Sequence, residues 1–424
     1  MSNASALTHA LLTPPIVRSP LALGRDPLPL PLRRDARLSV LDATEWFGET
    51  SGGIRTYLLQ KAAYVAARPS LRHVIVVPGE RDAISEGDGV RMYRLQGPRI
   101  PRQRPYRFML AARSIARLVQ HEAPDLIEIG SPFIVPWIVR HATRDLRVPM
   151  VCFYHTNLPR MFAPRTAHFS LSRQLLYRGV WRYMTRLDAL FPLTIVTSQY
   201  AADELAREGI TRVAKVPLGV DLERFTPARR AHAEATRRKH GLPAGPLAAC
   251  VGRFAREKEL ETVLDAWGTV ERQTGARLAL IGAGPMEATL RAHSYASRVT
   301  FVPFQSDRTA LADVLAAVDV VVAPGRMETF GLASLEALAS GTPVLSANDG
   351  GVAELVRRSG AGRTFVAGAV DDCAVQATAL FADDLVQRGV RGRAFAEDQH
   401  SWDAAFDALF SVYRTVVAEH GVGR

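Results

Sequence analysis

The sequence predicts an α/β protein built from two Rossmann-like, doubly wound domains that face a central cleft. From residue 37 onward, short apolar and β-branched runs alternate with longer segments in which apolar residues recur about every 3.6 positions. Several short runs are apolar throughout, as in parallel strands that helices cover on both faces. The 424 residues exceed one ordinary hydrophobic core, which favours two domains.

The first half of the chain alternates strand and helix candidates in sequence order. We expect strands at residues 38–43, 74–78, 90–95, 126–130, 150–154, 193–197 and 213–217. Helical patterns fall between most of them, for example at residues 54–67, 108–121 and 171–187. These elements define an N-terminal domain over residues 37–221.

The second half repeats the alternation after a hydrophilic stretch, residues 222–246, which has no strand pattern and is expected to be a linker. We expect strands at residues 247–252, 278–282, 299–303, 318–323 and 342–346. We expect helices at residues 260–273, 286–293, 310–317, 331–340 and 352–357. The second domain then covers residues 247–400. A last helix within residues 401–424 could belong to either half.

Residues 1–36 differ from the rest of the chain. They carry prolines at positions 14, 15, 20, 27, 29 and 31. They lack the basic start, unbroken apolar stretch and small-residue cleavage site of a signal peptide. We therefore expect a disordered, proline-rich leader.

The composition is that of a soluble globular protein, with 47% hydrophobic and 22% charged residues. No window offers the roughly 18 uninterrupted apolar residues of a membrane span. The three cysteines are widely spaced, and we expect buried thiols in a reducing compartment. The histidines show no metal-ligand spacing, so we expect no metal site.

The formal charge of +11 is concentrated in two arginine-rich stretches without acidic residues. They cover residues 97–118 and 157–187 and contain Arg99, Arg102, Arg104, Arg107, Arg113, Arg117, Arg160, Arg165, Arg173, Arg178, Arg182 and Arg186. A local basic surface is implied, and nucleic acid, anionic lipid and phosphorylated substrates are candidate partners.

The most specific motif runs from Glu328 to Glu336 and follows an apolar strand candidate. We expect Thr329 to cap the next helix, with the amides near Phe330, Gly331 and Leu332 in its first turn. Amides at a helix start, with a glycine allowing close approach, can bind a diphosphate. Glu336 has apolar neighbours and needs a polar partner, for which a ribose diol is suitable. Alternatively, one acid complements the helix dipole and the other lies on a solvated face.

A second motif places Arg253 and Lys258 on either side of a turn between a strand and a helix. At the carboxyl edge of a sheet, these cations can face the same diphosphate as the helix amides. Arg256 is the weaker candidate of the three basic residues. The alternative is ordinary surface charge before a helix.

Two glycine turns and one histidine complete the candidates. Gly53 belongs to a Gly-Gly turn after the first strand, and Gly282 and Gly284 belong to a Gly-Ala-Gly-Pro turn in which Pro285 suits the first helical position. Neither matches the dinucleotide-binding fingerprint, and each could line a ligand or only turn the chain. His155 closes the strand candidate 150–154 at the edge of the expected cleft, although a structural or surface histidine remains an alternative.

Together these motifs closely resemble the retaining glycosyltransferases of family 4, which have the GT-B fold. The resemblance covers about residues 38–415. Its strings include Gly-Gly-Ile, Tyr-His-Thr, the Val-Pro-Leu-Gly-Val-Asp that ends at Asp221, the Gly-Arg…Lys turn, Gly-Ala-Gly-Pro, and the two glutamates with Phe-Gly between them. The motif sequences are most similar to those of α-mannosyltransferases that use GDP-mannose, and UDP-sugar enzymes of the family are a close alternative.

The resemblance implies a role for each candidate residue. Arg253 and Lys258 would hold the donor diphosphate, Glu328 would contact the transferred sugar, and Glu336 would bind the ribose hydroxyls. His155 would lie near the sugar and β-phosphate, and Gly53 would approach the donor from the N-terminal domain. The nucleotide-sugar would be a substrate, with no cofactor and no metal, and stereochemistry would be retained by front-face attack.

The same resemblance makes the N-terminal domain the acceptor domain and the C-terminal domain the nucleotide-sugar donor domain. The acceptor would be a glycan or a lipid-linked hydroxyl. We expect a cytoplasmic protein, with the arginine-rich stretches as a docking surface on the cytoplasmic face of an anionic membrane. The rival class is a basic nucleic-acid-binding protein. It leaves the glutamate motif unexplained, so we do not expect a nucleic-acid partner.

Overall fold

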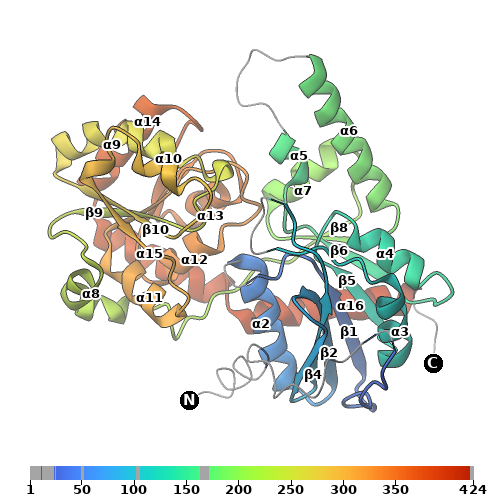
Figure 1. Cartoon of the computed structure of the whole chain (residues 1–424). Helices are drawn as coiled ribbons and strands as arrows, with labels where there is room; N and C mark the ends of the chain where they lie inside the picture. The colour runs from blue at the N-terminus through green and yellow to red at the C-terminus, as the bar shows by residue number, and fades with distance from the viewer. Residues whose placement is uncertain are drawn as a thin grey trace. The chain divides into compact units, whose positions relative to one another are not determined.

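The computed structural model of the chain describes residues 11, 23, 25–48, 52–101, 106–162 and 171–420 (Figure 1). The chain forms two compact units. The N-terminal unit contains Met1–Thr197, Ala202–Val216 and Phe406–Arg424, and the C-terminal unit contains Ser198–Ala201 and Pro217–Ala405. The last helix, which the sequence left unassigned, therefore contributes most of its length to the N-terminal unit.

An eight-stranded sheet, as far as the chain is described, forms the centre of the N-terminal unit. Its order is β3-β4-β2-β1-β5-β6-β7-β8, and neighbouring strands pair in parallel except β3 and β4, which are antiparallel. The strands are β1 (Leu38–Ala43), β2 (Leu71–Gly79), β3 (Ala83–Gly87), β4 (Val90–Gln96), β5 (Leu126–Ile129), β6 (Met150–Phe153), β7 (Thr194–Val196) and β8 (Val213–Lys215).

Strand β3 was absent from the sequence prediction. It forms a hairpin with β4 through Asp88 and Gly89, whose φ angles are 38° and 82°. An Asp-Gly pair with two positive φ angles is a preferred two-residue hairpin turn. The Asp-Gly pair is therefore a sequence signal for a hairpin turn. The strand before it is short and mostly polar, so the pattern of apolar residues did not predict that strand.

Helices connect the strands of this unit (Figure 1). They are α2 (Gly53–Ala66), α3 (Ala112–Glu122), α4 (Val135–Ala142), α5 (Leu158–Phe162), α6 (Leu171–Asp188), α7 (Gln199–Arg207) and α16 (Trp402–His420). Helix α3 begins four residues later than predicted, and residues 108–111 precede it without regular structure.

Residues 25–36 do not match the expected disordered leader. The Arg33 guanidinium donates to the carbonyl oxygens of Val65 and Ala66, both at 3.0 Å, and so binds the last turn of α2. The Pro29 carbonyl accepts from the His121 ring at 2.7 Å. Carbonyls at a helix end need external donors, which Arg33 supplies for α2, whereas Pro29 supplies an acceptor for the His121 ring. Most of the remaining leader lies outside the described residues.

Helix α16 is held by a buried polar cluster at the centre of the N-terminal sheet. The Lys61 ammonium contacts the Asp42 carboxylate at 2.9 Å and the Glu128 carboxylate at 3.4 Å, and donates to the Tyr413 hydroxyl at 2.7 Å. Burial raises the pKa of Glu128 to about 7. Buried charges are tolerated when they are paired in this way, and the pairing fixes α16 against α2, β1 and β5.

A six-stranded parallel sheet forms the described part of the C-terminal unit. Its order is β11-β10-β9-β12-β13-β14, which is the Rossmann order 3-2-1-4-5-6. The strands are β9 (Leu247–Val251), β10 (Arg277–Ile281), β11 (Val299–Val302), β12 (Val320–Ala323), β13 (Val344–Ala347) and β14 (Gly362–Phe365). Strand β14 was not predicted, because only part of it is apolar.

The helices of this unit lie around the sheet (Figure 1). They are η1 (Pro227–His232), α8 (Ala233–His240), η2 (Arg256–Lys258), α9 (Leu260–Thr274), α10 (Glu287–Arg291), η3 (Ala296–Arg298), α11 (Arg308–Ala317), α12 (Leu332–Ala339), α13 (Gly351–Ser359), α14 (Val370–Ala382) and α15 (Leu385–Gln399). The expected linker 222–246 is not an open connection, because η1 and α8 pack on α11 as part of this unit.

The core of the C-terminal unit is apolar, in contrast to the polar cluster of the other sheet. Trp267 of α9 and Leu280 of β10 are fully buried in it, together with Cys250 and Cys373. Cys152 is buried in the N-terminal unit, and all three thiols are free, as the sequence predicted. Among the described helices, none combines the length and apolarity needed to cross a membrane.

Candidate active site

The candidate residues of the C-terminal unit follow strands β9 and β12. These strands are neighbours, but the chain continues from β9 to β10 on one side and from β12 to β13 on the other. Doubly wound sheets bind ligands beside the carboxyl ends of the strands at such a reversal of order. Arg253 and Lys258 lie after β9, and Glu328 lies after β12. We call this edge the C-terminal switch point.

Gly282 and Gly284 pack against the turn that carries Arg253. A Cβ atom on Gly282 would lie 1.9 Å from the Gly252 carbonyl oxygen, and one on Gly284 would lie 2.4 Å from the Phe254 carbonyl oxygen. Close backbone packing therefore explains both glycines without a ligand. Pro285 does not occupy the first helical position, because α10 begins at Glu287.

The charged groups at this edge are paired with one another. The Lys258 ammonium forms an ion pair with the Glu328 carboxylate, and both side chains are 30% exposed. The Arg253 guanidinium pairs with Glu257 one turn later. Burial lowers the pKa of Lys258 to about 8, and the neighbouring Glu257 opposes this shift. An incoming anion can replace these carboxylates as the partner of two preplaced cations.

Helix α12 begins one residue later than predicted. Gly331 is its N-cap with a φ of +93°, and no side chain caps the helix, so the predicted capping by Thr329 is wrong. Instead, the Thr329 carbonyl accepts from the Ser198 hydroxyl at 2.6 Å. A Cβ atom on Gly331 would lie 2.3 Å from Val352, which with the positive φ requires glycine. Phe330 is buried, and Leu332 begins the helix half-buried, with its first-turn amides lacking intrahelical partners.

Glu336 is buried on α12, with 3% of its side chain exposed, and forms an ion pair with Arg308 of α11. Burial raises the pKa of Glu336, and Arg308 opposes the shift. The alternative of a solvated helix face is therefore wrong for this residue. The polar partner that its apolar sequence context required is a guanidinium in this structure, and Arg308 itself packs 5.1 Å from the Phe225 ring centroid.

His155 lies after β6 in the N-terminal unit. Its ring stacks on Phe153 with centroids 4.0 Å apart and meets Tyr57 edge-on at 5.1 Å. Burial lowers the pKa of His155 to about 4, so its imidazole is neutral at pH 7. The side chain is half-buried, so a structural or a ligand-binding role fits it better than a fully exposed surface position.

Gly53 is the first residue of α2. Among the described residues, nothing lies within 4 Å of the position that a Cβ atom would take on Gly53 or Gly52. Packing inside the described part of the unit therefore does not require glycine here, in contrast to Gly282 and Gly284. The neighbouring Ser51 lies outside the described residues.

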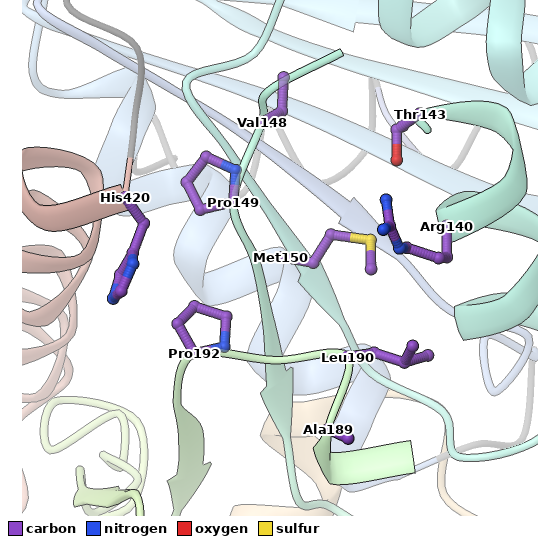
Figure 2. A pocket seen from close by; sticks show the side chains of 9 residues that line it. All are labelled: Arg140, Thr143, Val148, Pro149, Met150, Ala189, Leu190, Pro192 and His420. Atoms are coloured by element: carbon purple, nitrogen blue, oxygen red, sulfur yellow. The ribbon is translucent and has the colours of Figure 1, made fainter. Parts of the chain in front are cut away.

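A cavity of about 270 Å³ lies elsewhere in the N-terminal unit (Figure 2). Figure 2 shows Arg140 and His420 on opposite sides of Pro149 and Met150. Met150 is the first residue of β6, so this cavity lies at the amino ends of the strands. Ligands of doubly wound sheets bind at the opposite edge, and none of the predicted site residues lines the cavity. Within the described residues, no group of three acidic, histidine or cysteine side chains could hold a metal ion.

Comparison with known proteins identifies the family. Two family models match consecutive parts of the chain: Glycosyltransferase Family 4 at residues 51–224 and glycosyl transferases group 1 at residues 232–394. A GDP-mannose-dependent alpha-(1-6)-phosphatidylinositol dimannoside mannosyltransferase of Mycobacterium tuberculosis is 31% identical over 360 residues, covering 84% of this chain and 90% of that protein. The chain belongs to glycosyltransferase family 4.

Other similar proteins are named for different sugars. A sulfoquinovosyl transferase of Arabidopsis thaliana is 31% identical over 306 residues, covering 70% of this chain and 58% of that protein. The structure of a sucrose-phosphate synthase from Thermosynechococcus elongatus superposes with a TM-score of 0.72 at 21% identity, covering 90% of this chain and 100% of that chain. The likeness to this structure confirms the predicted GT-B fold and leaves the sugar open.

Sequence reasoning missed two arginines at the site of this family-4 glycosyltransferase. Arg308 pairs with Glu336, and Arg326 binds the Glu259 carboxylate through two nitrogens at 3.0 to 3.1 Å. Arg326 lies two residues before Glu328, so its place in the motif was a usable signal. Arg308 is the first residue of α11 and gave no such signal, because its partner lies 28 positions away.

Proposed function

We propose that this family-4 glycosyltransferase is a retaining, metal-independent hexosyltransferase. It moves a hexose, which we take to be mannose from GDP-mannose, onto a hydroxyl of a lipid-linked or glycan acceptor. The observation that carries the proposal is the gathering of Arg253, Lys258 and the start of α12 at one sheet edge. The nucleotide-sugar is a substrate, and we propose no cofactor.

The chemistry follows from where charge develops during transfer. As the sugar becomes oxocarbenium-like, the departing diphosphate gathers negative charge. Arg253, Lys258 and the amides near Phe330, Gly331 and Leu332 would stabilise that charge more in the transition state than in the ground state. Because these groups are fixed by the turn and the helix, little reorganisation accompanies the reaction.

The two glutamates would have different roles. Glu328 neutralises Lys258 without ligand, and a bound diphosphate would take over that role. The carboxylate would then be free to accept hydrogen bonds from hydroxyls of the transferred sugar. Glu336, held by Arg308, would accept hydrogen bonds from the ribose diol. Its burial makes an unpaired carboxylate costly, which supports a role that keeps it partnered.

We propose that His155 approaches the sugar and the β-phosphate from the N-terminal unit as a neutral imidazole, and that Gly53 allows the backbone to come close to the donor. Gly282 and Gly284 would border the nucleotide through the turn that they pack against. Each of these three glycines bears no side chain that would separate backbone from ligand.

A donor screen tests the proposal. Thermal unfolding is measured with GDP, UDP, ADP and their sugars, and a nucleotide at 100 times its dissociation constant should add about 2.7 kcal/mol of stability. We expect GDP and GDP-mannose to stabilise the protein most. Preference for UDP-sugars would replace mannose by the alternative donor class, and stabilisation by no nucleotide would overturn the proposal.

We also propose that the enzyme is cytoplasmic and docks on an anionic membrane through α6. Leu175 and Leu176 are 60% and 49% exposed, and Arg178 and Arg182 are exposed on the same helix. Leu175, Arg178 and Arg182 are three and four positions apart and therefore share one face. Figure 1 shows the first half of α6 extending beyond the rest of the N-terminal unit. Arg102, Arg104 and Arg165 lie outside the described residues.

Vesicle sedimentation tests the docking surface. Each arginine near an anionic surface contributes about 1 kcal/mol, so the double variant Arg178→Glu/Arg182→Glu should lose most binding to phosphatidylglycerol vesicles. The variant Arg238→Glu/Lys239→Glu makes the same charge change at exposed positions of α8 and should bind like the wild type. No sedimentation of the wild type at low salt would leave a soluble acceptor as the better hypothesis.

A further inference from the structure

The N-terminal sheet has a switch point of its own. Strands β1 and β5 are neighbours, and the chain continues from β1 to β2 on one side and from β5 to β6 on the other. Ala43 pairs with Ile129 at the ends of these strands, and the Gly130 amide donates to the Ala43 carbonyl at 3.0 Å. Glu45 and Ser131 follow directly, so both lie at the edge where ligands of such sheets bind.

Three buried polar atoms at this edge have no hydrogen-bond partner among the residues that the structure describes. They are Glu45 Oε2, Trp46 Nε1 and Ser131 Oγ. Glu45 and Ser131 are each only 1% exposed. A buried polar group without a partner costs about 1–3 kcal/mol, so three of them in the segments that follow two neighbouring strands need an explanation.

The surrounding groups hold these atoms in place. The Trp46 ring is wedged edge-on between Tyr106 and Phe133, with centroid distances of 4.9 and 5.4 Å. The Tyr183 hydroxyl lies 2.8 Å from the Phe133 carbonyl oxygen, which ties the loop after β5 to α6. The Ile134 backbone lies near the Glu45 carboxyl group and opposes the rise of its pKa. The unpartnered atoms are therefore preorganised rather than free to turn toward solvent.

The same edge adjoins the candidate catalytic histidine. A Cβ atom on Gly130 would lie 3.2 Å from Thr44 and 3.6 Å from the His155 ring. Thr44, which precedes Glu45, and His155 therefore both lie close to Gly130. A group bound at Glu45 and Ser131 would lie next to the position proposed for the transferred sugar.

The donor and acceptor pattern selects the ligand chemistry. An indole N–H only donates, an ionised carboxylate only accepts, and a serine hydroxyl does both. A hydroxyl group can accept from Trp46 while it donates to Glu45, and neighbouring hydroxyls can reach Ser131. An anion such as phosphate would face the Glu45 carboxylate, which disfavours it. Phe133 and Tyr106 add an aromatic border suited to the C–H face of a ring.

We propose that Glu45, Trp46 and Ser131 form an acceptor subsite for a neutral polyol ring, a sugar or a cyclitol, beside His155. The inference rests on the glycosyl-transfer function proposed above and names the chemical class of its acceptor. Burial raises the pKa of Glu45 to about 7, so near neutral pH the carboxyl group is partly protonated and can both accept from and donate to hydroxyls of a polyol.

The test measures polyol binding to the full chain without nucleotide. Saturation-transfer NMR titrations with methyl α-D-mannopyranoside and myo-inositol give the dissociation constants. Since one neutral hydrogen bond contributes about 1 kcal/mol, or roughly fivefold in affinity, Ser131→Ala and Trp46→Phe should each weaken binding about fivefold. Glu45→Gln, which keeps the shape and removes the charge, should also weaken it.

The control variant is Trp137→Phe. Trp137 lies on α4, and its indole N–H already donates to the Tyr183 hydroxyl at 3.1 Å. This variant should leave polyol binding within twofold. Thermal unfolding supplies a second readout, because Ser131→Ala removes an unpartnered hydroxyl and should leave the melting temperature unchanged or raise it. A merely structural serine would lower it.

Three results would overturn the subsite. They are no saturation transfer from either polyol to the wild type, unchanged affinity in Ser131→Ala and Trp46→Phe, or binding of inorganic phosphate in place of polyols. Because nucleotide is absent, a failure of the donor proposal is seen separately, as missing stabilisation by GDP, UDP and ADP while polyol binding persists.

Discussion

The two switch points of this enzyme occupy equivalent places in two similar sheets but differ in their chemistry. At the C-terminal switch point, Lys258 pairs with Glu328 and Arg253 pairs with Glu257. At the N-terminal one, Glu45, Trp46 and Ser131 keep buried polar atoms without partners among the described residues. The fold positions a ligand edge in each sheet, and the residues that follow the strands decide what binds there.

The difference has a physical reason. An ion pair keeps cations stable without ligand, and a diphosphate can exchange for the carboxylate because it offers equal or greater charge. A hydroxyl can satisfy a carboxyl group, an indole N–H and a serine hydroxyl at lower desolvation cost than a charged ligand. The comparison therefore separates the proposed site for an anionic leaving group from the proposed site for a neutral acceptor.

The largest expected effect concerns the paired cations. Lys258→Ala or Arg253→Ala should lower turnover by roughly 10²-fold or more, the scale seen when one preorganised charge-stabilising group is removed. Steady-state kinetics with the donor found in the screen measures this. Arg256→Ala changes an exposed arginine in the same 3-10 turn and is the matched control, with an expected change of a few-fold at most. Wild-type turnover in the first two variants would end the diphosphate assignment.

The next effect is on stability and isolates the N-terminal switch point. The pKa of Glu45 is raised from 4.5 to about 7 in the folded protein, so the folded state holds its proton more tightly than the unfolded state. The stabilising contribution is present below pH 4.5 and is lost as the pH rises toward 7. Relative to Glu45→Gln, the wild type should lose about 2 kcal/mol of unfolding free energy between pH 5 and pH 7.

Urea unfolding at several pH values measures that difference, and other titrating groups cancel because both proteins contain them. Glu208→Gln, at an exposed position, is the control and should follow the wild type. Parallel curves for the wild type and Glu45→Gln would mean that Glu45 has a cationic or donor partner in solution.

A smaller effect distinguishes the two glutamates of the C-terminal unit. Glu336→Ala should weaken nucleotide binding about tenfold, as for one charge-assisted hydrogen bond, whereas Glu328→Ala should chiefly depress both transfer and donor hydrolysis. Arg308→Ala releases Glu336 and should resemble Glu336→Ala. Isothermal titration and hydrolysis assays separate the cases. Equal, small changes in both glutamate variants would make the motif structural.

The smallest expected effect is none. Activity should survive exhaustive treatment with EDTA, because in the proposed mechanism Arg253, Lys258 and the helix amides would supply the charge stabilisation that a metal would otherwise provide. Complete loss of activity that Mg²⁺ or Mn²⁺ restores would contradict the metal-independent mechanism.

The sequence predicted the bounds of helices and strands well where the signal comes from neighbouring residues. Strand β1 has the predicted bounds, and α2, α6 and α9 begin and end within one residue of prediction. Apolar runs and 3.6-residue periods arise within a few turns, so neighbouring residues suffice to reveal them. The prediction of Thr329 as a cap failed because a glycine with positive φ, set by packing on Val352, begins the helix instead.

The sequence by itself determined the α/β class and the family motifs, and it supplied the residues that we propose to bind a diphosphate. Only the tertiary structure decided their partners, because Lys258 and Glu328 are 70 positions apart, and Lys61 and Tyr413 are 352 positions apart. It alone revealed that Glu45 Oε2 and Ser131 Oγ are buried and without a hydrogen-bond partner among the described residues. Burial and pairing depend on which distant segments pack together, and no local pattern encodes that.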